Sequence, residues 1–212
     1  MNTKVIIYGA GQNGRVVVEI LKATNRHSVV GFIDDNHALH NKTIVELPVL
    51  GDRTALDNLG TNGHIKSAFV SIGNNKIRAQ KALLMKEKGF ALINIIHESA
   101  IISESVELGE NVQIGAGAII NTNSKIGNNV IINTAATIDH DNEIGDNVQI
   151  CPGVHLAGVV KIQESSFIGT GAIVINNVTI GKNVVVGAGT LVLKDVPDNA
   201  VIIGVPGKVR EV

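Results

Sequence analysis

Aromatic side chains are almost absent from this sequence of 212 residues, which has no tryptophan, one tyrosine and four phenylalanines. Its single cysteine, Cys151, excludes an internal disulfide and leads us to expect a cytoplasmic location. The formal net charge is −1, which gives no reason to expect nucleic acid as a partner. No apolar run is long enough to span a bilayer, and the run at residues 5–8 is too short for a signal peptide, so we expect no membrane insertion.

Aliphatic residues and glycine stand in place of the aromatics, with 44% hydrophobic residues and 23 glycines. From residue 100 an aliphatic residue recurs at every sixth position without a slip: Ile102, Leu108, Ile114, Ile120, Ile126, Ile132, Ile138, Ile144, Ile150, Leu156, Ile162, Ile168, Val174, Ile180, Val186 and Val192. A period of six is typical of the hexapeptide β-helix, in which three hexapeptides form one triangular coil. A β-sandwich with regular turns is the alternative, and the unbroken spacing argues against it.

Glycine or asparagine follows the aliphatic residue in many repeats, as at Gly109, Gly115 and Asn121. These residue types tolerate tight corners and positive φ angles, so we expect the corners of the coil at these positions. The aliphatic column fills the prism, and each buried member contributes about 1.5–3 kcal/mol, so the stack needs no aromatic core. The period does not determine the handedness of the helix.

Residues 1–96 instead alternate strand and helix patterns. We predict strands at 4–8, 28–33, 68–72 and 91–96, and helices at 13–23 and 77–88. Such alternation predicts a small parallel sheet with helices on its faces. The expected fold is therefore an α/β Rossmann-like domain over residues 1–96, followed by an all-β parallel β-helix over residues 97–212.

A glycine-rich loop, Gly9-Ala10-Gly11-Gln12-Asn13-Gly14, follows the first strand and opens the first helix, a context that suits phosphate binding. The motif alone suggests NAD, but the domain is short for two mononucleotide halves, so one nucleotide diphosphate fits better. A tight turn without a ligand is the other possibility. The residues expected around the ligand are Gly9, Gly11 and Gly14 of the loop, with Asp34, Asp35, Asn74 and Arg78 at the strand ends.

Residues 18 positions apart lie in one column of a β-helix, so the spacing alone assigns residues to its corners. One column, which we call the His140 corner, contains Thr122, His140, Gly158, Asn176 and Lys194. His140 could take a proton while the Gly158 N–H meets an oxyanion one coil away. Lys194 lies three coils from His140, about 14 Å, a span that suits an extended thioester cofactor with distant phosphates. An ordinary surface histidine beside the surface Asp141 is the alternative.

A second column, the small corner, contains Pro152, Thr170 and Ala188, with Gly169, Gly171, Gly187 and Gly189 beside them. Small side chains let a ligand lie against the backbone. A groove between two neighbouring prisms, with one such corner from each, would require an oligomer, and a trimer is the natural closed form. The third column, the charged corner of Asp146, Glu164 and Lys182, is expected to be solvated.

The remaining candidates have weaker support. His155 is a rival base, or else a surface or interface histidine, and Cys151 is expected to be an unreactive turn residue. The histidines of the first half fall in expected loops and show no partner pattern: His27, His37, His40 and His64.

Both halves together resemble the NeuD-like and PglD-like family of sugar acetyltransferases. The resemblance covers essentially the whole chain, through "KVIIYGAGQNGRVVVEIL", "VGFIDDN", "VSIGNNKIR", the hexapeptide repeats and the closing "VIIGVPGKV". The order of these pieces is specific, whereas each alone is weak. The resemblance implies a left-handed β-helix and a setting in bacterial glycan assembly.

The resemblance also implies roles for individual residues. His140 matches the general base, Asp141 its partner carboxylate, and Gly158 the N–H donor to the thioester carbonyl, while Gly9, Gly11, Gly14 and Asp35 match the nucleotide-sugar pocket. The implied reaction transfers acetyl from acetyl-CoA to the amino group of a nucleotide-linked 4-amino-4,6-dideoxy sugar, with no metal. We expect a homotrimer with its site between subunits, and an acetyl-CoA site formed by His155, Gly158, Thr170, Gly171, Ala188, Gly189 and Lys194.

Four other functions remain as alternatives. The first is an O-acetyltransferase acting on a sialic acid or another sugar hydroxyl; the glycine-rich loop favours a nucleotide-sugar but does not decide between N- and O-acetylation. A γ-class carbonic anhydrase needs three histidine ligands, whereas the repeats hold only His140 and His155. A non-catalytic nucleotide-binding scaffold would not bind acetyl-CoA, and an NAD-dependent enzyme would give a nicotinamide-dependent signal.

Overall fold

The computed structural model describes residues 3–24, 27–61 and 65–210. The chain divides into two compact units, Met1–Glu98 and Ser99–Val212. Within the described residues, none of the helices is both long and apolar enough to cross a bilayer.

The first unit contains a four-stranded parallel sheet in the order β2-β1-β5-β6. Its strands are β1 (Thr3–Tyr8), β2 (His27–Ile33), β5 (Ser67–Val70) and β6 (Ala91–Leu92). Helix α1 (Gln12–Thr24) follows β1, and helix α3 (Asn75–Glu87) follows β5. Such a sheet buries both faces: Ile7 packs with Val17 and Leu21 of α1, while Ile6 packs with Met85 of α3 in a second cluster. The Rossmann-like expectation is confirmed.

Some elements of this unit differ from the predictions. The strand predicted at 91–96 is two short pieces, β6 and β7 (Ile95–Ile96). The predicted strand at 68–72 ends at Val70, because the chain turns into the loop that carries Ser71 and Ile72. Short elements between β2 and β5 were not predicted: η1 (His37–Leu39), β3 (Thr43–Ile44), β4 (Leu47–Pro48), η2 (Arg53–Ala55) and α2 (Leu56–Thr61).

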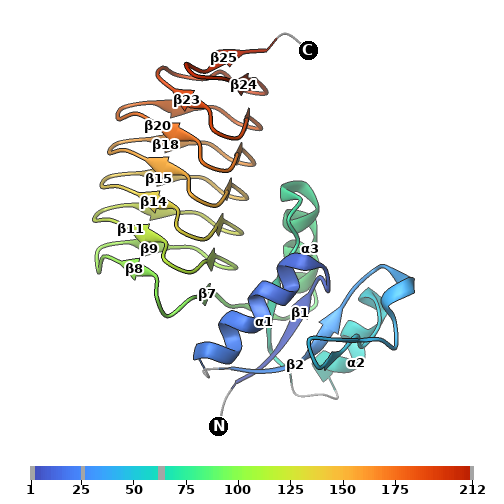
Figure 1. Ribbon diagram of the computed structural model, residues 1–212. Helices are drawn as coiled ribbons and strands as arrows, with labels where there is room; N and C mark the ends of the chain where they lie inside the picture. Colours follow the sequence, from blue (N-terminus) through green and yellow to red (C-terminus); the bar gives the residue numbers. More distant parts are fainter. Residues whose placement is uncertain (1–2, 25–26, 62–64, 211–212) are drawn as a thin grey trace. The chain divides into compact units, whose positions relative to one another are not determined.

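The second unit is a parallel β-helix whose coils stack as three sheets of short strands (Figure 1). The first face carries β8 (Ile101–Ile102), β11 (Ile119–Ile120), β14 (Thr137–Ile138), β17 (His155–Leu156), β20 (Ile173–Val174) and β23 (Leu191–Val192). The second face carries β9 (Glu107–Leu108), β12 (Lys125–Ile126), β15 (Glu143–Ile144), β18 (Lys161–Ile162) and β21 (Thr179–Ile180). The third carries β10 (Gln113–Ile114), β13 (Ile131–Ile132), β16 (Gln149–Ile150), β19 (Phe167–Ile168), β22 (Val185–Val186) and β24 (Val201–Ile203), which pairs with β25 (Lys208–Val209).

The register of the coils confirms the predicted period. Ile138 pairs with Leu156, and Leu156 pairs with Val174, each 18 residues on. The predicted inward column is buried from Ile114 to Val192, whereas Ile102 and Leu108 in the first coil are half-buried. The period shortens only after this column, where Val186 pairs with Ile202.

The residues that follow the inward column have a different role from the one predicted. Positive φ angles occur two residues later than expected, at Asn111 (57°) and Gly117 (66°) rather than at Gly109 and Gly115. At some of the positions directly after the aliphatic residue, glycine is required by the close approach of the next coil. A Cβ on Gly127 would lie 2.4 Å from Oδ1 of Asp146, and one on Gly169 would lie 2.6 Å from the Val186 carbonyl oxygen.

Candidate active site

His140 and Asp141 form the tight turn between β14 and β15. Asp141 has a φ of 58°, in the left-handed region that aspartate tolerates, and its Oδ2 lies 2.8 Å from Nδ1 of His140. Asn123, one coil earlier, donates from Nδ2 to Oδ1 of Asp141 at 3.2 Å. An ionised carboxylate only accepts hydrogen bonds, so Nδ1 of the neutral imidazole carries the proton and Nε2 is left basic.

The same contacts set the ionisation of the pair. The hydrogen bond to Asp141 raises the pKa of His140, against the opposing effect of burial and with support from the charges of Asp139 and Asp141. The bonds from His140 and Asn123 lower the pKa of Asp141. Both side chains are about half exposed, so the basic nitrogen is accessible to a substrate.

The imidazole lies directly on Gly158 of the next coil. A Cβ on Gly158 would be 2.5 Å from Cε1 and 2.6 Å from Nε2 of His140, so any larger residue would displace the ring. The Gly158 N–H donates to no partner within the described part of the chain. Val159, which follows, has a φ of 62°, an uncommon conformation for a β-branched residue.

Asn142 supports this turn from inside the prism and was not singled out from the sequence. Its buried Nδ2 donates to the carbonyl oxygens of Asp139 at 2.6 Å and Ala157 at 3.1 Å, and its Oδ1 accepts from Val160 N at 2.9 Å. Ser124, one coil earlier, also donates to the Asp139 carbonyl at 2.9 Å. The available signal was a polar residue in the inner column, which carries serine at 124 and valine at 106, 160 and 178.

The residues predicted for acetyl-CoA lie at two edges of the first face. Thr170 and Gly171 form the turn that enters β20, whereas Asn176, in the same column as His140, lies in the turn that leaves it. The small corner and the His140 corner are therefore separated by a strand within one chain. His155 lies between them on β17, with Nδ1 2.8 Å from Oγ1 of Thr137. All of the predicted acetyl-CoA residues except Gly158 are exposed: His155, Thr170, Gly171, Ala188, Gly189 and Lys194.

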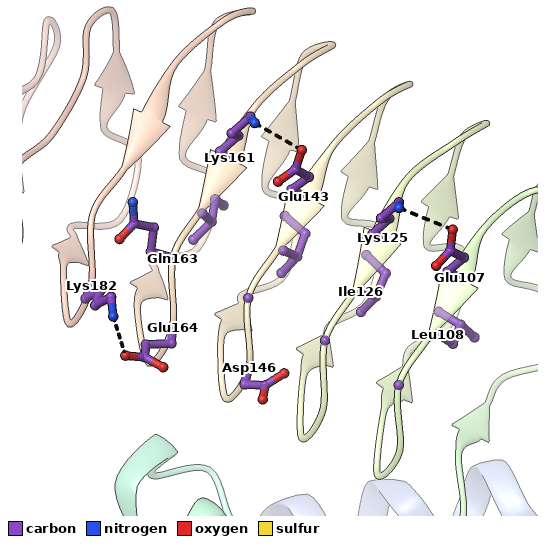
Figure 2. A pocket seen from close by; sticks show the side chains of 15 residues that line it. Glu107, Leu108, Lys125, Ile126, Glu143, Asp146, Lys161, Gln163, Glu164 and Lys182 are labelled. Carbon is purple, nitrogen blue, oxygen red and sulfur yellow. Dashed lines mark ion pairs between the residues drawn. The ribbon is translucent and has the colours of Figure 1, made fainter.

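The second face carries a shallow groove of about 660 Å³, shown in Figure 2. Its charges are matched along the stack: Glu107 pairs with Lys125 at 3.5 Å, Glu143 with Lys161 at 3.0 Å, and Glu164 with Lys182 at 2.9 Å. Asp146 in the charged corner accepts from the Asn128 N–H at 2.7 Å. The charged side chains of this groove are therefore paired with one another, and none of these paired groups is placed as a nucleophile or base for a substrate.

A second cavity, of about 840 Å³, lies in the first unit at the carboxyl ends of β1, β2 and β5. Gly9 and Gly11 line it, and nothing lies within 4 Å of a Cβ placed on Gly11, so the backbone there is open to a ligand. Gly14 serves the loop instead, because a Cβ on it would lie 2.3 Å from the Gly9 carbonyl oxygen. The lining also includes Tyr8, Gln12, Asn13, Asp34, Asp35, Ser71, Ile72, Gly73, Ile77, Gln80 and Lys81.

The two aspartates after β2 have different partners. Asp34 accepts from the N–H groups of Ala10 and Asn36, both at 2.8 Å, so its carboxylate holds the glycine-rich loop. Asp35 accepts from the Tyr8 hydroxyl at 2.8 Å and pairs with Nζ of Lys81 at 2.5 Å. Burial alone would raise the pKa of Asp35, but the bonds from Lys81 and Tyr8 outweigh it and lower the pKa.

Asn74 and Arg78 do not line this cavity, contrary to the prediction. Asn74 is the N-cap of α3, where its Oδ1 accepts from Ile77 N at 3.0 Å. Arg78 is fully buried and donates to the carbonyl oxygens of Ile72 at 2.9 Å and Gly73 at 3.1 Å. Burial lowers the pKa of Arg78 to about 10. The Arg78 side chain therefore stabilises the loop after β5 through these hydrogen bonds.

Lys81 is a cation of this cavity that was not singled out from the sequence. It lies three residues after Arg78 on α3, and its ammonium group is 5.3 Å from the centre of the Tyr8 ring. Lys81 could have been identified from its spacing, because residues three positions apart lie on the same face of a helix and Arg78 was already a candidate for the nucleotide site.

Comparison with known proteins agrees with both units. Residues 4–83 match the family model of the PglD N-terminal domain, and residues 105–140 and 159–194 match that of the bacterial transferase hexapeptide. PerB from Caulobacter crescentus, solved in complex with CoA and GDP-perosamine, is 41% identical over 98% of this chain and 97% of its own, with a TM-score of 0.93.

Two further solved structures cover nearly the whole chain. The acetyltransferase domain of PglB from Neisseria gonorrhoeae, in complex with acetyl coenzyme A, is 35% identical over 99% of this chain and 100% of its own, with a TM-score of 0.91. WeeI from Acinetobacter baumannii is 28% identical over 99% of this chain and 100% of its own, with a TM-score of 0.89. The chain is therefore a member of the PglD-like family of acetyl-CoA-dependent sugar N-acetyltransferases.

Proposed function

We propose that this enzyme transfers acetyl from acetyl-CoA to the 4-amino group of a nucleotide-linked 4-amino-4,6-dideoxy sugar. The two substrates to be compared are UDP-4-amino-4,6-dideoxy-N-acetylglucosamine, which would give UDP-N,N'-diacetylbacillosamine, and GDP-perosamine, with which PerB was solved. We place the reaction in the cytoplasm, with which a lone cysteine is compatible.

The observation that carries the proposal is the stack of His140 on Gly158, with Nδ1 held by Asp141. The amine nitrogen of the sugar attacks the thioester carbonyl carbon and forms the C–N bond. Nε2 of His140 takes the proton from the amine, and the Gly158 N–H donates to the oxyanion of the tetrahedral intermediate. The intermediate then expels the CoA thiolate as the C–S bond breaks.

The cavity of the first unit would hold the nucleotide. Gln12 and Asn13, the first residues of α1, line this cavity, and a helix N-terminus suits a phosphate. Lys81 adds a positive charge on the cavity wall, and Asp35 offers carboxylate oxygens to a ribose hydroxyl. Asp34 positions the loop, because its oxygens already accept from backbone N–H groups.

A trimer would bring the His140 corner of one subunit beside the small corner of the next. The two corners lie on either side of the first face of the prism. If this face points toward a threefold axis, the His140 corner of each subunit lies next to the small corner of its neighbour. Outward aliphatic side chains on that face support such burial, since Ile101 is 63% and Ile173 46% exposed. Acetyl-CoA would lie in the resulting groove, along Thr170, Gly171, Ala188 and Gly189, with Lys194 toward its phosphates.

The proposal is tested by following thiol release from acetyl-CoA with both nucleotide amino sugars and with their 4-hydroxy analogues. We expect turnover with an amine and none with a hydroxyl acceptor; the reverse would make the enzyme an O-acetyltransferase. His140→Ala should lower kcat by about 10²–10⁴-fold with little change in acetyl-CoA binding. His155→Ala is the matched histidine control, and we expect it to affect the KM for acetyl-CoA more than kcat. Near-normal turnover by His140→Ala would reject the assignment of the base.

A further inference from the structure

Three possible metal ligands meet in the segment after β2, and none of them lines either cavity described above. His37 and His40 lie at the start and at the C-cap of η1, and Asp52 is the N-cap of η2. Each offers one ligand atom, and these atoms lie within 4.8 Å of one another. The prediction that His37 and His40 have no partner pattern is therefore wrong, while His64 lies outside the described residues.

The two histidines are held on one side of η1 by its geometry. A 3₁₀-helix has three residues per turn, so side chains three positions apart are eclipsed. The His40 N–H donates to the His37 carbonyl at 3.2 Å, and the ring centroids are 4.7 Å apart. Asn36 caps the start of η1 by accepting from Ala38 N at 3.1 Å. The backbone of η1 thus brings the two histidines to the same side of the helix.

The existing hydrogen bonds of His40 and Asp52 leave one nitrogen of His40 and one oxygen of Asp52 able to bind a cation. Nε2 of His40 lies 2.9 Å from the Asp34 carbonyl oxygen, which only accepts, so Nε2 carries the proton and Nδ1 keeps its lone pair. Histidine ligands of metals commonly donate their other N–H to a carbonyl in this way. Oδ1 of Asp52 accepts from the N–H and hydroxyl of Thr54, whereas its Oδ2 faces Nδ1 of His37 at 3.9 Å.

We propose that His37, His40 and Asp52 form a binding site for Zn²⁺ or a similar first-row transition-metal ion. Two imidazole nitrogens and one carboxylate oxygen suit these ions, with the fourth position left to water. Tetrahedral bonds of about 2.0–2.2 Å would bring the ligand atoms about 3.3 Å apart, so the cluster must contract on binding. The His37 side chain is 80% exposed and free to rotate inward. This inference does not depend on the proposed sugar substrate.

The consequence of binding would be local order next to the nucleotide cavity. The metal would join η1 to η2, and His40 would link both to the Asp34 carbonyl. The carboxylate of the same Asp34 holds the Ala10 N–H in the glycine-rich loop. The site is therefore positioned to stabilise the rim of the cavity, and none of its ligands is a residue assigned to acetyl transfer.

The test is a titration of the chelator-treated full-length protein with Zn²⁺ in competition with a chromophoric chelator. We expect one equivalent to bind, and the melting temperature to rise with added Zn²⁺. His37→Ala, His40→Gln and Asp52→Asn should each weaken this binding by at least about tenfold. Asp52→Asn keeps the Oδ1 acceptor that caps η2, so its loss of affinity would not reflect misfolding. His97→Ala, which replaces a histidine outside the cluster, just after β7, is the control and should bind like the unaltered protein.

Co²⁺ gives a second readout that is independent of activity. A visible d–d spectrum of one bound Co²⁺ should appear in the unaltered protein and be absent in His37→Ala. Binding that is much below one equivalent, or that survives all three substitutions, would overturn the proposal. Loss of binding in His140→Ala or His155→Ala instead would place the metal elsewhere and would equally overturn it.

Discussion

The imidazole of His140 depends on one adjacent residue for both its tautomer and its affinity for a proton. The sequence could not establish whether the short side chain of Asp141 reaches this ring. It does so because Asp141 adopts a φ of 58° in the turn, which turns its carboxylate back to a nitrogen 2.8 Å away. Contacts between sequence neighbours depend on such local angles, which a period of six residues does not specify.

Asp141→Asn tests this pairing through the pH dependence of kcat/KM. Because Asp141 raises the pKa of His140, its removal should move the acid limb of the profile to lower pH. The plateau should fall by about tenfold or more, since an amide no longer fixes the proton on Nδ1. Steady-state rates across the acid range provide the measurement. An acid limb that stays in place, with an unchanged plateau, would mean that another group is the base.

At the scale of the turn and its strands, the sequence predicted which residues stack on one another in a column better than it predicted which side chains contact one another between columns. The spacing of 18 residues is enough to predict that His140 lies over Gly158, because identical coils must superpose. It did not identify the buried Asn142, whose position looks like one more inward residue. The strand pattern also led to the prediction of Arg78 in the nucleotide cavity, although its guanidinium group fits inside the loop after β5.

Asn142→Val tests whether the inner column positions the catalytic turn. Valine occupies the same column at Val160, so the coil should still form. The Val160 N–H and the Ala157 carbonyl would lose their bonds to Asn142, while the Asp139 carbonyl would keep only its bond from Ser124. Each buried group left unpaired costs about 1–3 kcal/mol. We expect a lower melting temperature and a lower kcat. Ser166→Ala removes a comparable internal bond to the Gly181 carbonyl, far from His140, and should lower the melting temperature without lowering kcat. Equal kcat values in both variants would contradict a positioning role.

The end of β1 and the middle of α3 act together in the nucleotide cavity. Lys81→Gln removes the charge that faces Asp35, and with it the cation proposed to meet the diphosphate. We expect the KM for the nucleotide sugar to rise by about tenfold or more, with the KM for acetyl-CoA unchanged, since a hydrogen bond to a charged group contributes about 1.5–3 kcal/mol. Lys76→Gln, an exposed lysine near the start of the same helix, is the matched control. A similar rise in both variants would indicate a general effect of charge.

At the scale of the whole molecule, each unit has its own core, and the sequence predicted both because each follows one simple rule. Alternating strands and helices give the parallel sheet, and a strict period gives the prism. The segment between residues 34 and 61 follows neither rule. Its 3₁₀-helices, its hairpin and the cluster of His37, His40 and Asp52 arise from local capping and packing, which lack a period to detect.

The proposed assembly makes the first face of the prism an interface, and this gives a prediction for the oligomer. Ile173→Asp would place a carboxylate in the middle of that face, where burial without a partner is costly. Light scattering after size exclusion should show trimers for the unaltered enzyme and smaller species for the variant. Turnover should fall with the loss of trimer, because each site would need the small corner of a neighbour. Val185→Asp, at a similar 41% exposure on the third face, is the control and should leave both assembly and turnover intact. An active monomer of Ile173→Asp would show that one chain holds a complete site.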